Sequence, residues 1–440
     1  MQEKYIKRQL DNELIRWKND DSRKPLLLRG ARQVGKSSSV RYFSNQFEYF
    51  VEINFEMEKK VHEFFVDDLS PQKIIDKLSI LYDIPIIPGK TLLFFDEIQA
   101  CLPAISSLRF FYEKMPELHL VAAGSLLEFA LTELPSFGVG RIRSLFVYPL
   151  SFNEFLDASG ENTLKKEMQK ASPKHPLDNI FHEKLLTYLR LFLVLGGMPE
   201  VVAEYIKTKD IKRTQQILDD LVISLKDDFV KYKAKVPSLR INEIFDSVIQ
   251  QSGGKFMYSK ASLTSNHLQI KEALELLIMA GLVIPVTHTS ANGLPLGAEA
   301  NPTKRKMLLF DTGILQRLSG LPLSDIILGN DFKSINKGHL AEQFVGLELL
   351  KSSSHFARNE LYYWHREAKS SNAEVDYLIQ HGEQIIPIEV KSSNQGSMQS
   401  MYLFLNEKHL DFGIRTSLEN FSEYNQIKVY PLYAISKLEE

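Results

Sequence analysis

The sequence predicts an α/β protein whose N-terminal part is built on a parallel sheet with helices on both faces. Short apolar runs that suit buried strands alternate there with amphipathic segments that suit helices. Two of these runs end in glycine-rich or acidic residues, as strands do where the carboxyl edge of a parallel sheet meets a ligand. The composition, 44% hydrophobic and 25% charged, is that of an ordinary globular protein.

The elements of this N-terminal part follow from the pattern in order. Ile6, Leu10, Leu14 and Trp17 recur at helical spacing, so a leading amphipathic helix is expected at 5–17. We expect strands at 26–28, 50–55, 91–97 and 119–125, and further helices at 37–43, 61–81 and 108–115. A turn into another helix at 148–155 closes this region.

A glycine-bearing loop with the spacing G-x-x-x-x-G-K-S follows the first strand. Gly30 and Gly35 let the backbone curl so that successive N–H groups face one concavity, which binds phosphate oxygens. Lys36 would reach the β- and γ-phosphates, and the Ser37 hydroxyl would bind Mg²⁺. A plain surface turn before a helix is the alternative. The residues predicted to hold the nucleotide are Gly30, Ala31, Arg32, Gln33, Val34, Gly35, Lys36, Ser37, Ser38 and, further on, Ser125.

Two carboxylates end the third strand. Four apolar residues followed by Asp96 and Glu97 suit a buried parallel strand whose acids emerge at its carboxyl edge. Asp96 would join the Mg²⁺ shell, and Glu97 would polarise the attacking water. An acidic pair at a strand end is common and is weak evidence alone. The phosphate loop earlier in the same α/β pattern supports the interpretation of Asp96 and Glu97 as catalytic-site residues. Together the two motifs predict a P-loop site that binds and hydrolyses ATP with Mg²⁺.

Two further residues are candidates for this site, each with an open alternative. Ser125 ends the fourth strand, where a hydroxyl would orient the water between the γ-phosphate and Glu97, or it is a small turn residue. Arg141 lies in the stretch 138–143, which follows a loop at 135–137. It is predicted as an arginine finger or sensor for the γ-phosphate, acting within the chain or on a neighbouring copy in a homo-oligomer. A simple surface arginine is its alternative, and Arg143 competes for the role.

Charge, cysteine content and hydropathy indicate the compartment and the classes of partner that the sequence predicts. A formal net charge of −2 gives no overall attraction to nucleic acid, so any DNA-binding surface must be local. The single cysteine, Cys101, rules out an intrachain disulfide and suits a reducing compartment. The polar N-terminus has no apolar signal core, and no run of about 18 apolar residues occurs. We therefore expect a soluble cytoplasmic protein without a membrane partner.

The middle of the chain changes character. The stretch 161–178 is charged and carries two prolines, which indicates an exposed insertion or linker, and 181–206 reads as helices broken at 196–199 that form a small lid. Helices at 241–249, 258–263 and 269–280 precede strands at 282–284 and 306–310, which is the order of a winged helix-turn-helix. Such folds bind DNA or serve as protein adaptors. The cations that would touch phosphates are Lys260, Lys271, Lys304, Arg305 and Lys306.

A second group of charged residues lies in the last hundred positions. Glu342 falls on a predicted helix, Asp376 opens a strand, and Glu389 and Lys391 share one face of the next strand. Three carboxylates make an oxygen-rich Mg²⁺ site, and Lys391 would orient water or stabilise charge on a phosphate. This arrangement suits phosphodiester hydrolysis; a charged sheet edge is the alternative.

Taken together, the motifs resemble a large bacterial and archaeal family of AAA-type ATPases fused to a restriction-nuclease-like C-terminal domain of unknown function. The resemblance covers nearly the whole chain. Its anchors are residues 30–37, 95–99, 124–125, 140–141, 149–155, 196–200, 374–376 and 388–391. The phosphate-loop and acidic motifs are generic to P-loop ATPases. More specific in combination are the phosphate loop preceded by Leu-Arg-Gly, the Pro-Leu-Ser-Phe run at 149–152 and the paired C-terminal motifs.

The resemblance implies an α/β fold with four parts: an AAA-type P-loop ATPase core (1–155), a helical lid or linker (156–215), a winged-helix-like domain (216–330) and a PD-(D/E)xK nuclease-like domain (331–440). The nuclease pattern maps onto Glu342, Asp376, Glu389 and Lys391, with Val375 where the family has proline. The preference for ATP over GTP rests on the resemblance alone.

Two functions follow as hypotheses. In the first, ATP hydrolysis drives action on DNA and the C-terminal site cleaves it. In the second, the chain is a nucleotide-gated switch for protein partners, and its nuclease-like domain is an inert docking fold.

Overall fold

The computed structural model describes residues 5–66, 68–134, 140–232, 236–320, 337–368, 372–391 and 397–438. The chain forms two compact units. The first comprises Met1–Tyr148 with Ser354–Arg358, and the second comprises Pro149–Ser353 with Asn359–Glu440. Among the described residues, no helix has both the length and the apolar character needed to cross a membrane.

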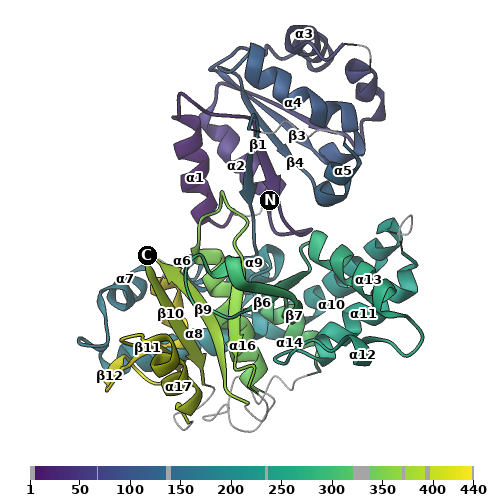
Figure 1. Ribbon diagram of the computed structural model, residues 1–440. Coiled ribbons are helices and arrows are strands. Elements are labelled where there is room, and N and C mark those ends of the chain that lie inside the picture. The colour runs from purple at the N-terminus through teal and green to yellow at the C-terminus, as the bar shows by residue number, and fades with distance from the viewer. Residues whose placement is uncertain are drawn as a thin grey trace. The chain divides into compact units, whose positions relative to one another are not determined.

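The first unit is built on a five-stranded parallel sheet (Figure 1). Its strands are β1 (Leu26–Arg29), β2 (Tyr49–Asn54), β3 (Thr91–Asp96), β4 (His119–Ala123) and β5 (Arg143–Phe146). The strand order is β2-β3-β4-β1-β5, so β4 lies between the strand that precedes the phosphate loop and the strand that ends in Asp96. All carboxyl ends of these parallel strands therefore meet at one edge of the sheet.

Helices cover both faces of this sheet, as the apolar pattern predicts. They are α1 (Gln9–Lys18), α2 (Lys36–Phe43), α3 (Pro71–Tyr82), α4 (Leu102–Lys114) and α5 (Leu127–Glu133). Figure 1 shows α1 and α2 on one side of the sheet and α3, α4 and α5 on the other. The second group encloses one continuous core, in which Phe55, Phe65 and Phe95 meet edge to face at ring distances of 5.4–5.7 Å. The predicted parallel α/β arrangement is confirmed.

The differences from the predicted elements of the first unit are small. The leading helix begins at Gln9 instead of residue 5, and α4 begins at Leu102 instead of residue 108, because Leu102-Pro103 supplies a helix start with proline in the first turn. The strand β5 was not predicted. Residues 135–139 of the loop before Arg141 lie outside the described residues.

The second unit combines helices with a mixed eight-stranded sheet. Its helices are α6 (Phe152–Ala158), α7 (Asn162–Lys170), α8 (Asn179–Leu195), α9 (Pro199–Thr208), α10 (Ile211–Asp228), α11 (Ser238–Gln250), α12 (Tyr258–Ala261), α13 (His267–Met279), α14 (Thr312–Leu318), α16 (Lys337–Ser352) and α17 (Gln399–Lys408). Its strands are β6 (Val283–Thr289), β7 (Ala300–Leu309), β8 (Leu361–His365), β9 (Glu374–His381), β10 (Gln384–Val390), β11 (Gly413–Ser417), β12 (Ser422–Tyr424) and β13 (Ile427–Pro431).

The order of this sheet is β12-β13-β11-β10-β9-β8-β6-β7. The helices α11, α12 and α13 precede the β6–β7 hairpin in the predicted order. However, β6 also pairs in parallel with β8, so the hairpin continues the sheet that carries the C-terminal acidic residues. This pairing brings β7 within reach of that site.

The stretch 161–178 is more ordered than a linker would be. Residues 162–170 form α7, because Leu164 and Met168 lie one helical turn apart and are both buried. The predicted break at 196–199 is confirmed: α8 ends at Leu195 and α9 begins at Pro199. Between them the N–H of Gly197 donates a 2.7 Å hydrogen bond to the buried carboxylate of Asp311.

Candidate nucleotide site and acidic cluster

The phosphate loop joins β1 to α2 with a backbone that needs its glycines. Gly30 has φ 142° and Gly35 has φ 94°, both in the region that favours glycine. A Cβ atom on Gly30 would lie 2.1 Å from the carbonyl oxygen of Val147. Because α2 begins at Lys36, its first N–H groups have no partner inside the helix and are suited to bind an anion.

The other loop residues divide by where their side chains lie. Ala31 and Val34 are buried, so they present only backbone groups, whereas Gln33 and Ser38 are exposed and Arg32 is half-buried. Arg8, a residue that the sequence reasoning missed, donates hydrogen bonds to the carbonyl oxygens of Val34 (3.1 Å) and Tyr148 (2.8 Å). The loop is therefore held from outside as well as by its own glycines.

Lys36 is buried within this loop. Its ammonium donates hydrogen bonds to the carbonyl oxygens of Gly30 (2.9 Å) and Ala31 (2.7 Å). Burial lowers the pKa of Lys36 to about 8, although the carboxylates of Glu97 and Asp96 act in the opposite direction. The loop thus holds a cation whose charge is poorly solvated and suited to a phosphate partner.

Ser37 and Asp96 are brought together as predicted. The hydroxyl of Ser37 donates a 2.9 Å hydrogen bond to Oδ1 of Asp96. Asp96 is 5% exposed, and its burial raises the pKa of the carboxyl group while the Ser37 hydroxyl lowers it. A hydroxyl and a carboxylate side by side at a phosphate loop fit the oxygen ligands that Mg²⁺ prefers.

Glu97 is fixed at the end of β3 by two neighbours. It has φ 49°, which turns its side chain out of the strand direction. Its Oε2 accepts hydrogen bonds from Nε2 of Gln99 (2.5 Å) and from the hydroxyl of Ser125 (3.3 Å). The position of Ser125 follows from the sheet order, because β4 lies next to β3. Sequence reasoning missed the contact that Gln99 makes.

Arg141 lies beside α4, where its guanidinium is paired with the carboxylate of Glu113. Arg143 begins β5, pairs with Asp20 at 3.1 Å and lies over the ring of Phe356. The role of Arg141 toward a nucleotide, in this chain or a neighbouring copy, stays a prediction.

The second site lies where β9, β10 and α16 meet, elements that Figure 1 shows side by side. Register pairs Ile388 with Tyr377, and the N–H of Val390 donates a 2.8 Å hydrogen bond to Oδ2 of Asp376. Lys391 bonds Oε1 of Glu389 at 2.6 Å, as their shared strand face predicts. The predicted hairpin at 381–383 is confirmed, with Gly382 at φ 58°.

A fifth residue joins this acidic cluster, which we define as Glu342, Glu374, Asp376 and Glu389. The ammonium of Lys306 lies 2.7 Å from Glu342, 2.5 Å from Glu374 and 3.4 Å from Asp376. Burial alone would lower the pKa of Lys306, but the carboxylates outweigh it and hold the pKa well above its ordinary value. The prediction that Lys306 touches DNA phosphates is wrong for this structure, because its side chain is buried among carboxylates.

The donor set of the cluster fits a divalent cation. Carboxylate oxygens come from a helix and two strands, and burial raises the pKa of Glu342 and of Glu389. Among the described residues, Oε2 of Glu389 is buried without a hydrogen-bond partner. Sequence reasoning found Glu342, Asp376, Glu389 and Lys391, but missed Glu374 although it lies within the recognised motif.

Comparison with known families divides the chain into three matched regions. Residues 22–156 match the family described as an AAA domain, and this match contains the phosphate loop, Asp96, Glu97 and Ser125. Residues 186–325 and 337–435 match two further families, each described as a domain of unknown function. No protein with a curated description matches the sequence.

Several solved structures are distantly similar to this chain. A Walker-type ATPase of Pyrococcus abyssi is 16% identical, with a TM-score of 0.46 over 72% of this chain and 97% of its own. The Orc1 protein of Aeropyrum pernix in complex with DNA is 12% identical, with a TM-score of 0.30 over 72% and 94%. Drosophila ORC bound to DNA is 15% identical, with a TM-score of 0.27 over 72% and 84%.

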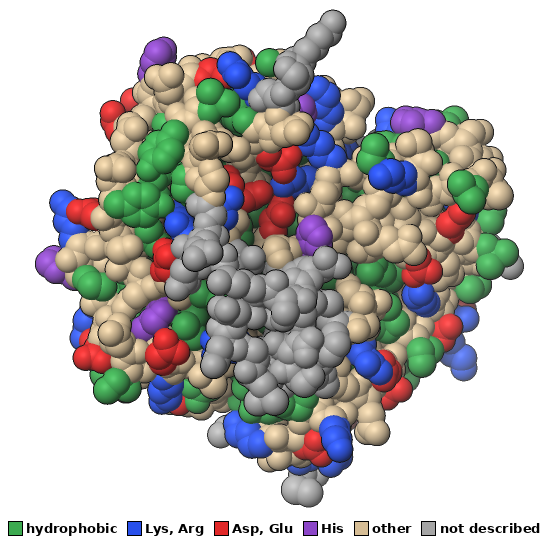
Figure 2. All heavy atoms as spheres, turned by 90° about the horizontal axis from the view of Figure 1, so that it is seen from below, with side chains coloured by type: hydrophobic (Ala, Val, Ile, Leu, Met, Phe, Trp, Pro, Cys, Tyr) green, Lys and Arg blue, Asp and Glu red, His purple; other side chains and the backbone are tan. Residues whose placement is uncertain are grey.

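A cleft of about 700 Å³ adjoins the acidic cluster. Glu374 lines it together with Lys255 and Lys260, which lie before and on α12, and with His339 and His365. Figure 2 shows, on the face seen from below, acidic and basic side chains gathered next to one another with a histidine beside them. A cleft that carries both lysines and a carboxylate of the cluster is suited to a phosphate-bearing ligand.

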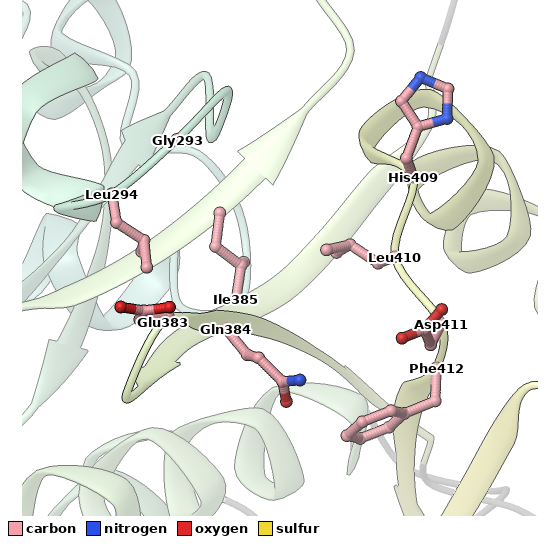
Figure 3. A pocket seen from close by; sticks show the side chains of 9 residues that line it. All are labelled: Gly293, Leu294, Glu383, Gln384, Ile385, His409, Leu410, Asp411 and Phe412. Carbon is pink, nitrogen blue, oxygen red and sulfur yellow. The ribbon is translucent and has the colours of Figure 1, made fainter.

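Two other features of the second unit are less suited to that chemistry. A hollow of about 530 Å³ lies at the far end of β10, and Figure 3 shows Glu383 and Asp411 at its wall. None of the described residues that line it is Lys or Arg. His288, His365 and Glu367 offer ligand atoms within 4.8 Å of one another, but the carboxylate of Glu367 is paired with Lys304.

Proposed function

We propose that this chain is an AAA-type ATPase that hydrolyses Mg²⁺-bound ATP in its first unit and acts on DNA through its second. The observation that carries the first part is the convergence of four polar residues at one sheet edge. Ser37 meets Asp96, and Ser125 meets Glu97, although the four come from three separate segments of the chain.

Each of these side chains has a chemical task. Bound Mg²⁺-ATP supplies the γ-phosphoryl group, with Ser37 and Asp96 as the residues that would hold the ion. Lys36 would leave the loop carbonyls to neutralise phosphate charge. Glu97 would accept the proton of the attacking water, and Gln99 and Ser125 orient its carboxylate for that step.

The proposal for DNA rests on the second unit. The acidic cluster offers oxygen ligands for a divalent cation, and Lys391 is bonded to Glu389 where it would stabilise charge on a phosphate. Lys255 and Lys260 place positive charge along the adjoining cleft. Two of the similar solved structures, Orc1 of Aeropyrum pernix and Drosophila ORC, are bound to DNA, which raises the question whether this chain also binds DNA.

One observation favours the second candidate function, a nucleotide-gated switch for protein partners with an inert nuclease-like fold. Lys306 already neutralises part of the acidic cluster, and it contacts three of the four carboxylates. A cluster held permanently in this way would contribute to stability and bind no catalytic ion.

The decisive experiment measures Mg²⁺-dependent ATP hydrolysis with and without single-stranded, duplex and branched DNA, while the DNA is followed for nicks. Glu97→Gln should abolish hydrolysis and keep ATP binding, and Asp376→Asn should abolish nicking alone. The matched controls are Glu48→Gln, on the exposed surface of the first unit, and Asp411→Asn, at the hollow away from the cluster.

The outcomes separate the two candidates. Hydrolysis stimulated by DNA, with nicking lost only in Asp376→Asn, would establish two coupled sites. Hydrolysis indifferent to DNA, with no nicking, would support the protein-switch function. An absence of hydrolysis in the presence of Mg²⁺ would contradict the ATPase proposal itself.

A further inference from the structure

We infer that Lys306 is a tethered cation that occupies the divalent-ion position of the acidic cluster, so that Mg²⁺ or Mn²⁺ binds there only when Lys306 is displaced. This inference rests on the proposed role of the cluster as a metal site. It adds that the site is occluded by the chain itself, through a residue outside the recognised motif.

The surroundings of Lys306 are those of a bound cation. Its side chain is 3% exposed, and its ammonium contacts carboxylates from α16 and from two positions of β9. The ammonium also lies 5.3 Å from the centre of the Tyr363 ring, a cation–π distance. Three carboxylates around one ammonium form a polar cage comparable to the oxygen shell of a metal ion.

A second observation indicates that the cage can bind a cation other than the ammonium of Lys306. Oε2 of Glu389 is buried and, among the described residues, has no hydrogen-bond partner, although Oε1 of the same carboxylate is bonded to Lys391. An unsatisfied buried carboxylate oxygen is costly, and a divalent cation would satisfy it together with Asp376. Lys306 contacts the other side of the cluster and leaves this oxygen unpaired.

An ammonium and a divalent cation exclude each other from such a cage. Both would share the carboxylates of Glu342 and Asp376, and like charges at that separation repel strongly in a buried site. The formal charge of the four carboxylates and the two lysines is −2, from four negative and two positive groups. Loss of Lys306 makes it −3, which favours uptake of a cation from solvent.

The backbone of Lys306 is held in place, so only its side chain is free to leave. Its strand β7 pairs with β6, and Lys255 forms an isolated antiparallel β-bridge with Lys306. The N–H of Phe256 donates a 2.8 Å hydrogen bond to the carbonyl oxygen of Arg305, the residue before Lys306. Glu374, the most exposed of the three partners, lines the cleft that carries Lys255 and Lys260. A polyanion bound in that cleft would compete with Glu374 for Lys255, which lies 3.5 Å from that carboxylate.

The test measures Mn²⁺ binding by the full chain after chelation, without nucleotide, so that the phosphate loop contributes little. Mn²⁺ is followed by electron paramagnetic resonance, and the melting temperature is measured with and without Mn²⁺. Lys306→Met should bind Mn²⁺ at least about tenfold more tightly than the parent chain. Its melting temperature should rise on Mn²⁺ addition, whereas that of the parent should not.

Two variants serve as controls. Lys226→Met removes a lysine of the second unit whose partner is Asp246, and should behave as the parent does. Lys306→Met combined with Asp376→Asn should lose the gained Mn²⁺ site. Should Lys306→Met fail to fold, Lys306→Gln also removes the ammonium, leaves the formal charge at −3 and should show the same gain.

Equal Mn²⁺ binding by the parent and a folded Lys306 variant, whether tight or absent in both, would overturn the inference. Tighter Mn²⁺ binding without any DNA cleavage would uphold it and reject the nuclease part of the proposed function. Cleavage that appears only in the Lys306 variant, together with the Mn²⁺ gain, would support both.

Discussion

The hydroxyl of Ser37 and the carboxylate of Asp96 are 2.9 Å apart, although 59 positions separate them in the chain. The contact forms because β1 and β3 are parallel strands of one sheet, so the loop after β1 and the acid at the end of β3 reach the same edge. Asp96 is nearly fully buried there, and Glu97 follows it with a side chain held by Gln99 and Ser125. These contacts fix the positions of the two carboxylates relative to Ser37 and Ser125.

Gln99 should matter for hydrolysis through the position of Glu97. Gln99→Leu removes the donor to Oε2 of Glu97, and the loss of one hydrogen bond to a charged group corresponds to roughly tenfold in rate. The turnover number should fall by about that factor while ATP affinity stays unchanged. Steady-state kinetics with a separate binding titration checks this, and partial recovery in Gln99→Asn would support a positioning role. An effect on ATP affinity instead of turnover would contradict it.

ATP binding should take up a proton at alkaline pH. Burial lowers the pKa of Lys36 to about 8, and a triphosphate would favour the ammonium and raise that pKa again. Above about pH 8 the association constant should therefore fall, approaching tenfold per pH unit. Calorimetry in buffers of different ionisation enthalpy measures the uptake directly. Lys36→Arg keeps its charge and should show none; uptake that persists in this variant would assign the proton elsewhere.

The first unit should lose stability in mild acid because of His119. Burial lowers its pKa from 6.5 to about 4, so the folded unit keeps the ring neutral while the unfolded chain binds a proton. The unfolded state thus holds more protons between these pH values, and the free energy of unfolding should fall as pH drops from 6.5 to 4. We expect a loss of about 2 kcal/mol, which allows for partial solvent screening.

The ring of Trp17 lies 5.6 Å from that of His119 and provides the measurement. The protein has two tryptophans, so urea unfolding of a Trp364→Phe chain followed by fluorescence reports on the first unit. His119→Gln should flatten the pH dependence in this window. An equal slope in both chains would show that another group is responsible.

Gly197 should be intolerant of a side chain. A Cβ atom there would lie 2.2 Å from the carbonyl oxygen of Leu150, and the N–H of Gly197 is bonded to Asp311. Gly197→Ala should destabilise the second unit by about 2–3 kcal/mol. Gly293→Ala meets nothing within 4 Å and serves as the matched control. Urea unfolding of a Trp17→Phe chain, followed through Trp364, compares the two, and equal stability would contradict the close packing.

The sequence predicted the first unit well because its signals are local. A phosphate loop, an acidic strand end and strands of four to six apolar residues each carry their own pattern, and parallel strands make their carboxyl ends converge. The strand β5 was not predicted because its sequence, Arg143-Ser144-Leu145-Phe146, is short and half polar. The helix α7 was not predicted because only two of its residues, Leu164 and Met168, are apolar and buried, and the residues around them are mostly charged.

Sequence alone identified most of the residues that we propose for the chemistry of the two sites. Ser37, Asp96, Glu97, Glu342, Asp376 and Glu389 follow from motif and alternation. Only the tertiary structure decided the counter-ion of the second site. Lys306 lies 70 positions from Asp376, and it reaches the cluster because β6 pairs with β8 and carries β7 into the same sheet. Pairing between strands that are distant in sequence depends on the packing of the whole sheet. It therefore cannot be predicted from a local sequence pattern.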